Sequence, residues 1–365
     1  MMNRSRLRDL GISIGNLPTG PHNAITDVSG VWVGHSTLIT DQPRVARTGV
    51  TVVVPREGQI RHDYAFAGYH RFNGNGEMTG LQWVAESGLL TSPIALTNTH
   101  QVGVVRDALI EYELRLHEGA DWQLPVVAET WDGFLNDIGA FHLTKAHLFE
   151  AMADAKAGKV AEGNVGGGTG MICHAFKGGI GTSSRVVSVA DDAYTVGVFV
   201  QSNYGQRHDL RVDGVPVGRE IDEERVPFPW TEPTPTSSII VIIATDAPLL
   251  PVQCNRLAQR ATVGLARVGG TGHNGSGDIF LAFATGNHIP SDSALTLDKG
   301  KGHLIGLQML PHNQLDPFFD AVAEATEEAI LNALVAAETM VGLKGRVAHA
   351  LPLDELKRVM KKYSF

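Results

Sequence analysis

Residues Ile239–Ala244 form an uninterrupted run of apolar, mostly β-branched side chains, and this run limits the folds that are open to the chain. An apolar stretch of this length is typical of a β-strand that is buried on both faces. Ile94–Leu96 and Val126–Ala128 are also apolar throughout. Sheets made of such strands are covered on both sides by other layers. The sequence therefore predicts a layered α/β sandwich.

The expected strands and helices alternate along the chain. The helix that starts at Asp316 has Pro317 in its first turn, where a missing N–H costs nothing, and Gly342 just past its expected end. The predicted strands are Val31–Val33, Val50–Val54, Ile94–Leu96, Val126–Ala128, Val186–Val189, Thr195–Gln201, Ile239–Ala244 and Ile279–Phe283. The predicted helices are Val105–His117, Leu143–Ala157, Leu249–Arg267, Asp316–Met340 and Leu353–Lys362.

Composition excludes several classes of partner. The 39 acidic and 30 basic residues give a net charge of −9, and no basic cluster is longer than a few residues, so nucleic acid is not an expected partner. Cys173 and Cys254 are too few for a disulfide framework, which favours a reducing compartment. Neither a signal-peptide pattern nor an apolar run long enough to span a bilayer is visible. We therefore expect a cytoplasmic protein without a membrane partner.

Ser238 stands directly before the longest apolar run, after the proline-rich segment Glu232–Ser237. This position places a hydroxyl and its own backbone nitrogen at the mouth of a sheet. If the peptide bond before Ser238 is cut, that nitrogen becomes an α-amine with a pKa of about 7.7–8.0. Such an amine can act as general base for the hydroxyl of the same residue. The alternative is an ordinary loop that leads into a strand.

A second candidate site is Asn274–Asp278, immediately before the predicted strand Ile279–Phe283. Residues two apart in an extended chain point to one side, so Ser276 and Asp278 can face the same site. A hydroxyl backed by a carboxylate could hold and polarise an α-amine that shuttles a proton. The alternative is a turn in which Asp278 satisfies backbone donors.

Two other candidate sites also follow predicted strands. Glu129, at the end of one strand, could pair with a cationic group of a substrate, and Trp131 could form the wall of a pocket. The alternative is a solvated acid beside a core aromatic. Asn203 follows the strand Thr195–Gln201, where its amide could donate to an oxyanion without carrying net charge. Asparagine is also common in plain turns, which is the alternative there.

The glycine-rich segment Gly163–Gly181 does not match a nucleotide-binding loop. A G-x-G-x-x-G register that starts at Gly166 puts Met171 where the third glycine belongs, and no Walker lysine–serine pair follows. The histidines show no H-E-x-x-H pattern. We therefore expect neither a cofactor nor a metal ion. Cys173 has no obvious orienting carboxylate nearby in the sequence and is expected to fill the core.

Several separated motifs together resemble the DmpA-type aminopeptidases, a family that includes L-aminopeptidase/D-amidase/esterases and β-peptidyl aminopeptidases. The resemblance extends over essentially the whole chain. The motifs occur in the family's order, which makes the resemblance specific. They are Gly74–Gly80, Gly163–Met171, Phe176–Arg185, Ser238–Leu249 and Asn274–Asp278.

The resemblance implies a self-processing enzyme. Residues 1–365 would form one domain that cuts itself between Ser237 and Ser238, leaving a large subunit 1–237 and a small subunit 238–365. The implied fold is an αββα four-layer sandwich that resembles N-terminal nucleophile hydrolases but has a different connectivity. Family members usually assemble as a tetramer of cleaved protomers.

The family pattern also assigns roles by position. Ser238 matches the nucleophile, and Ser276 and Asp278 match the residues that orient the nucleophile and its amine. Asn203 matches the oxyanion donor, and Glu129 matches the acid that receives the free amino group of the substrate.

Two positions depart from the pattern. Trp131 stands where some members have a tyrosine whose hydroxyl is thought to assist catalysis. An indole N–H can donate a hydrogen bond but cannot act as an acid–base group. The residue before the cut is Ser237 rather than a single family consensus residue. This difference could change the rate of self-processing.

The function that follows is a self-cleaving serine aminopeptidase. It would release N-terminal amino acids from short peptides, amino-acid amides and esters, and the family's β-peptidyl members extend this range to β-peptides. Two alternatives are an acyltransferase of the ornithine acetyltransferase type and a non-catalytic binding protein of the same fold. The acyltransferases use a threonine nucleophile, so the serine at position 238 argues against the first.

Overall fold

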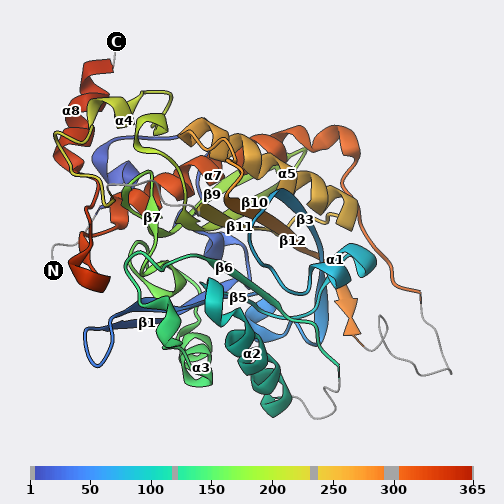
Figure 1. The fold of residues 1–365 in the computed structure, drawn as a ribbon. Coiled ribbons are helices and arrows are strands. Elements are labelled where there is room, and N and C mark those ends of the chain that lie inside the picture. The colour runs from blue at the N-terminus through green and yellow to red at the C-terminus, as the bar shows by residue number, and fades with distance from the viewer. Residues whose placement is uncertain (1–4, 117–121, 231–236, 292–303, 364–365) are drawn as a thin grey trace.

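The computed structural model describes residues 5–116, 122–230, 237–291 and 304–363. Two β-sheets lie face to face between two pairs of helices, so the molecule has four layers in the order helix, sheet, sheet, helix (Figure 1). The predicted layered α/β sandwich is confirmed, in the αββα form that the family resemblance implied. Residues 232–236 of the proline-rich linker and His117 lie outside the described residues.

The larger sheet has the strand order β4-β3-β12-β11-β10-β9. Its two central strands, β11 and β12, run parallel, whereas the other neighbouring pairs are antiparallel. Parallel neighbours begin at the same edge of a sheet, and here Ser237 lies opposite Ser276. The strands are β3 (Asp63–Gly74), β4 (Leu89–Leu90), β9 (Gly179–Val189), β10 (Asp192–Asn203), β11 (Ser237–Thr245) and β12 (Ser276–Pro290).

The smaller sheet has the strand order β1-β2-β5-β6. β5 and β6 run parallel and end together, with Thr97 opposite Glu129. The strands are β1 (Trp32–Thr40), β2 (Ala46–Val54), β5 (Ile94–Asn98) and β6 (Val126–Thr130). Two short hairpins lie outside both sheets and consist of β7 (Ile172–Cys173) with β8 (Phe176–Lys177), and β13 (Met340–Val341) with β14 (Val347–Ala348).

Helices cover the outer face of each sheet. α5 (Pro251–Val268) and α7 (Asp316–Ala336) pack on the larger sheet, and α2 (Val102–Leu116) and α3 (Lys145–Asp154) pack on the smaller one (Figure 1). The shorter helices are α1 (Leu81–Ser87), α4 (Val217–Glu220) and α8 (Leu353–Tyr363). Among the described residues, no helix combines the length and the apolar character needed to cross a bilayer.

β11 is buried on both faces, as its uniform apolar sequence predicts. Ile240 and Ile242 belong to the core between the two sheets, whereas Ile239 and Val241 belong to the core under α5 and α7. Full burial of side chains of this size contributes about 1.5–3 kcal/mol each. This strand therefore joins the two cores and fixes the position of the serine at its start.

The prediction for α7 was wrong at its end. The helix stops at Ala336, Met340 lies in β13, and Gly342 is not its cap. The side chain of Asn164 exchanges two hydrogen bonds with the backbone of Glu338, at 2.8 and 3.1 Å. Because these bonds hold the chain in an extended conformation, a contact distant in sequence ends the helix.

β3 was not predicted. Its sequence is rich in polar and aromatic residues, and its burial does not alternate along the strand. Its place between β4 and β12 in the larger sheet depends on pairing with β12, which no local sequence pattern indicates.

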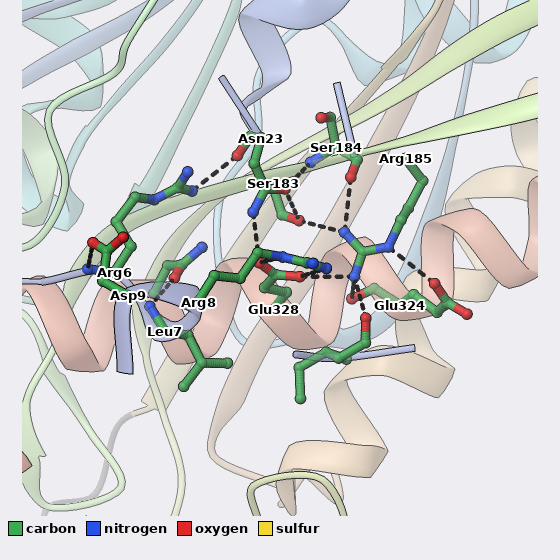
Figure 2. Close-up of polar contacts among 12 residues, drawn as sticks. Arg6, Leu7, Arg8, Asp9, Asn23, Ser183, Ser184, Arg185, Glu324 and Glu328 are labelled. Carbon is green, nitrogen blue, oxygen red and sulfur yellow. Dashed lines mark hydrogen bonds and ion pairs between the residues drawn. The ribbon is translucent and has the colours of Figure 1, made fainter. Parts of the chain in front are cut away.

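Buried charges tie the N-terminal segment to α7 (Figure 2). The guanidinium of Arg185 is fully buried and contacts Glu324 at 2.9 Å and Glu328 at 2.8 Å. Arg8 also contacts Glu328, at 2.8 Å, and the backbone N–H of Leu7 donates to Asn332. Burying charges is costly unless each is paired and hydrogen-bonded, as these are. The cluster therefore links the N-terminal segment, β9 and α7.

Candidate active site

Ser238 is the second residue of β11 and is 3% exposed. Its register partners are Asn203 on β10 and Gly277 on β12. Within the described part of the chain, its Oγ has no hydrogen-bond partner. A buried hydroxyl without a partner at the start of a strand is free to attack a carbonyl placed beside it.

Ser276 and Asp278 lie on the opposite face of the larger sheet from the side chain of Ser238. They share the face of β12 that carries Phe280 under the helices, whereas Ser238 shares the face of β11 that carries Ile240 between the sheets. Side chains alternate along a strand, which produces this division. The Ser276–Asp278 pair can therefore serve the backbone nitrogen of Ser238 rather than its hydroxyl.

The two residues of this pair are bonded to each other. The hydroxyl of Ser276 donates to Oδ1 of Asp278 at 2.6 Å. Burial raises the pKa of Asp278 to about 6, against the opposing effects of the Ser276 hydroxyl and the backbone N–H of Ile239. Asp278 therefore accepts a hydrogen bond from a backbone N–H, as the alternative interpretation expected, and it accepts one from Ser276 as well.

The side chain of Asn203 is held at both ends. It is the last residue of β10, and its Oδ1 accepts a hydrogen bond of 2.9 Å from the backbone N–H of Ile172. Its Nδ2 donates to the backbone oxygen of Trp131, also at 2.9 Å. An amide nitrogen carries two hydrogens, so one remains for a ligand. Asn203 therefore lies in a strand with a fixed amide, and a plain turn does not describe it.

Glu129 lies near the end of β6 and is 3% exposed, so a solvated acid does not describe it. Its Oε1 accepts from the backbone N–H of Glu77 at 2.9 Å, and its Oε2 accepts from the hydroxyl of Thr99. Burial raises the pKa of Glu129, and these two bonds lower it in part. The carboxylate is held in place, and a cationic partner would stabilise its charged form.

Gly76 brings Glu129 close to the strand beside Ser238. A Cβ placed on Gly76 would lie 3.3 Å from Oε1 of Glu129 and 3.1 Å from the Cα of Gly277. Gly277 is the register partner of Ser238. The glycine lets the backbone pass between the two sheets, so the acid of one sheet lies near the serine of the other.

A pocket with an aromatic wall opens next to these residues. Its lining includes Asn203 and Ser237 together with Trp131, Phe134, Tyr204 and Trp230. The structure therefore places Trp131 in the wall of a pocket. Sequence reasoning did not single out Phe134, Tyr204 or Trp230. Tyr204 directly follows Asn203, which was the only available signal.

The glycine-rich segment fills space between the sheets. The turn Gly166–Gly168 packs against strands of both sheets, and a Cβ on Gly167 would lie 2.1 Å from Oε1 of Gln201. Close backbone approach therefore accounts for these glycines. Cys173 is fully buried, and burial raises the pKa of its thiol to about 12, which does not suit a nucleophile. No three His, Cys, Asp or Glu side chains of the described residues gather as a metal site.

Comparisons with known proteins identify the family. Residues 23–348 match the model of peptidase family S58. The chain is 46% identical to the beta-peptidyl aminopeptidase BapA of Sphingosinicella microcystinivorans, over 98% of this chain and 92% of the relative. It also resembles the structure of a Burkholderia sp. beta-aminopeptidase, with 51% identity, a TM-score of 0.93 and 99% of each chain covered.

A second solved structure extends the comparison to the fold. The L-aminopeptidase D-Ala-esterase/amidase of Ochrobactrum anthropi is 40% identical, with a TM-score of 0.89 and 98% of each chain covered. It is described as a prototype for the serine aminopeptidases and as a variant of the Ntn hydrolase fold. These matches confirm the predicted family resemblance and the prediction of a hydrolase. The chain belongs to peptidase family S58, and it is a serine aminopeptidase with a variant of the Ntn hydrolase fold.

Proposed function

We propose that this aminopeptidase cuts its own chain between Ser237 and Ser238 and then uses Ser238 as an N-terminal nucleophile. The products are a large subunit, 1–237, and a small subunit, 238–365. The observation that carries the proposal is the buried hydroxyl of Ser238, which has no hydrogen-bond partner among the described residues and lies beside Asn203 at the start of β11. The Ser276–Asp278 pair on the other face of the sheet provides a support for the amine that cleavage would release.

In the intact chain, the hydroxyl of Ser238 attacks the carbonyl carbon of Ser237. The C–N bond breaks, the carbonyl carbon becomes esterified to Oγ of Ser238, and the released nitrogen takes up the hydroxyl proton. Water then hydrolyses the ester, which leaves a carboxylate on Ser237 and a free hydroxyl on Ser238.

In the cleaved enzyme, the α-amine of Ser238 takes the proton from its own hydroxyl. The oxygen attacks the carbonyl of the substrate's first residue, and the remaining N–H of Asn203 stabilises the oxyanion. One such donor contributes about 2.7–4 kcal/mol in comparable sites. The amine then protonates the leaving group, and water releases the acyl group from the serine.

Glu129 gives the site its requirement for a free substrate amine. A buried carboxylate that receives a substrate ammonium gains a charge-assisted hydrogen bond in a region with little water. The substrates are short peptides, amino-acid amides and esters. The names of the Sphingosinicella and Burkholderia relatives favour β-amino-acyl groups among them. Trp131 and the other aromatic residues of the pocket would contact the side chain of the released residue.

The cleaved protomers are proposed to form a tetramer in the cytoplasm. Leu304, Leu307 and Met309 are exposed apolar residues before α7 and offer a surface for such contacts. Both cysteines are free and buried, which fits a reducing compartment. The relatives named above are peptidases, which favours hydrolysis over acyl transfer or binding alone.

Intact mass of the wild type, Ser238→Ala and Ser237→Ala tests the proposal. The wild type and Ser237→Ala are expected to give two pieces that divide after residue 237, because the hydroxyl of Ser237 takes no part in the attack. Ser238→Ala is expected to stay at 39.1 kDa and to hydrolyse none of the β-alanyl, L-alanyl and D-alanyl p-nitroanilides. An active, uncut wild type, or an active Ser238→Ala, would overturn the proposal.

A further inference from the structure

The side-chain nitrogen of Lys177 is buried, and none of the carboxylates that the structure describes lies beside it. The residue is 0% exposed, and its Nζ donates to the backbone oxygens of Met171 at 2.7 Å, Gly178 at 2.8 Å and Gly168 at 3.4 Å. No described carboxylate lies within 4.0 Å of this nitrogen, and burial lowers the pKa of Lys177 to about 7. Burying a lysine in this way costs free energy of folding, which raises the question of what its three hydrogen bonds do.

One of these contacts belongs to the peptide unit that holds Asn203. The carbonyl of Met171 and the N–H of Ile172 are the two ends of the same peptide group. Nζ of Lys177 binds the carbonyl end, and the N–H end donates to Oδ1 of Asn203 at 2.9 Å. Hydrogen bonds linked in series polarise one another, most strongly where water is excluded.

The far end of the series points to the nucleophile. Withdrawing electron density at Oδ1 of Asn203 makes its Nδ2 hydrogens better donors. One of them is taken by the backbone oxygen of Trp131, which leaves the other for a ligand on the face of the sheet that Asn203 shares with Ser238. The same contacts prevent the amide from rotating, which keeps its donor aimed at one place.

We propose that Lys177 is a positioning residue for the oxyanion site, acting on Asn203 through the Met171–Ile172 peptide group. This proposal rests on the role proposed for Asn203 above. Lys177 itself touches no reacting atom. Its effect appears in the transition state, where charge develops on the substrate oxygen.

Arg207, which follows β10 and packs against the β7–β8 hairpin, is a buried cation with a structural role. It is 2% exposed, lies 3.6 Å from the ring centre of Phe176, and donates to the backbone oxygens of His174 and Ala175. These two residues have φ values of 49° and 56°, so they form a tight turn that needs support. Arg207 contacts neither end of the Met171–Ile172 peptide group and is a matched control.

The first experiment compares Lys177→Met with Arg207→Met. Activity is measured per cleaved chain, with cleavage followed by intact mass, and melting temperature is measured alongside. We expect both variants to lose stability, but only Lys177→Met to lose about tenfold in kcat at unchanged KM. Lys177→Gln, which keeps an uncharged donor, supplies folded protein if Lys177→Met does not. Equal kcat losses for the two positions would make Lys177 purely structural.

A double-mutant cycle with Asn203→Ala separates this inference from the proposed function. If Lys177 acts through Asn203, then replacing Lys177 in the Asn203→Ala protein costs less than twofold, instead of about tenfold. An equal loss in both backgrounds would overturn the inference and leave the role of Asn203 intact. Full activity of Asn203→Ala would instead overturn the oxyanion role itself.

Discussion

Asn203 and Ser238 are register partners across β10 and β11, so their side chains leave the same face of the larger sheet. That face looks toward the smaller sheet, which contributes Glu129. The amide of Asn203 is already fixed by Ile172 and Trp131 before any substrate binds. A donor arranged in advance needs no reorganisation when the oxyanion forms, and this is the source of its catalytic value.

Replacing Asn203 with Asp is expected to lower kcat by about 10²–10³-fold, the usual effect of losing one oxyanion donor. The carboxylate keeps the acceptor for Ile172 but loses both N–H donors and adds charge of the wrong sign. Initial rates on a free-amine p-nitroanilide, with KM measured separately, provide the check. A variant whose KM rises while kcat stays constant would show that Asn203 binds the ground state only.

The pH profile of kcat/KM reports on Asp278. Its pKa is raised to about 6, so it gains a proton as the pH falls through that value, and the support for the amine weakens. The α-amine, whose ordinary pKa is about 7.7–8.0, also gains a proton as the pH falls. We therefore expect kcat/KM to decrease on the acid side of the profile, its acid limb, with the uptake of two protons, one by Asp278 and one by the amine.

Asp278→Asn is expected to reduce this limb to one proton. Without the neighbouring negative charge, the pKa of the amine falls, so the limb also moves to lower pH, by about one unit. Ser276→Ala keeps the carboxylate and is the control, with a lower rate but a two-proton limb. An unchanged limb in Asp278→Asn would show that Asp278 does not face the amine.

Glu129→Gln is expected to lower kcat/KM by about 10²-fold for substrates with a free amino group. The neutral amide cannot pair with a substrate ammonium, and its NH₂ conflicts with one of the donors from Glu77 and Thr99. N-acetylated substrates should be affected far less. Glu77→Gln is the control because it makes the same chemical change on an exposed side chain and keeps the backbone donor. Equal losses on free and acetylated substrates would contradict the role of Glu129.

Asp132 makes stability depend on pH. It is 1% exposed, and burial raises its pKa to about 7 from an ordinary value of 3.8. The folded state therefore favours the protonated form. Its contribution to stability is fully present at pH values below the unfolded pKa and is lost as the pH rises through about 7.

Asp132→Asn should remove this loss, because Oδ1 can still accept the hydrogen bond from Asn136. Urea unfolding should show the variant to be about 1–2 kcal/mol more stable than the wild type at about pH 8, and little different at about pH 5. Asp107→Asn, at a carboxylate that is 66% exposed, is the control and should show no such difference. A variant that is less stable at both pH values would show that Asp132 is ionised in the folded protein.

Much of the fold could be predicted from the sequence because the strong signals are local. The strands of both cores carry apolar runs, and the helices predicted over Leu249–Arg267 and Leu353–Lys362 begin and end within two residues of α5 and α8. β3 and the end of α7 could not be predicted in this way. Pairing with β12 places β3 in the sheet, and Asn164 ends α7, and both partners are far away in the chain.

The sequence by itself determined the layered α/β class, the family and the candidate residues, because apolar runs and ordered motifs are carried by neighbouring residues. Only the tertiary structure decided how the candidates are arranged. It placed Ser238 and the Ser276–Asp278 pair on opposite faces of one sheet, buried Glu129, and connected Lys177 to Asn203. Burial, register and hydrogen bonds between distant segments exist only once the chain has folded, and they set the pKa values and the direction of each donor.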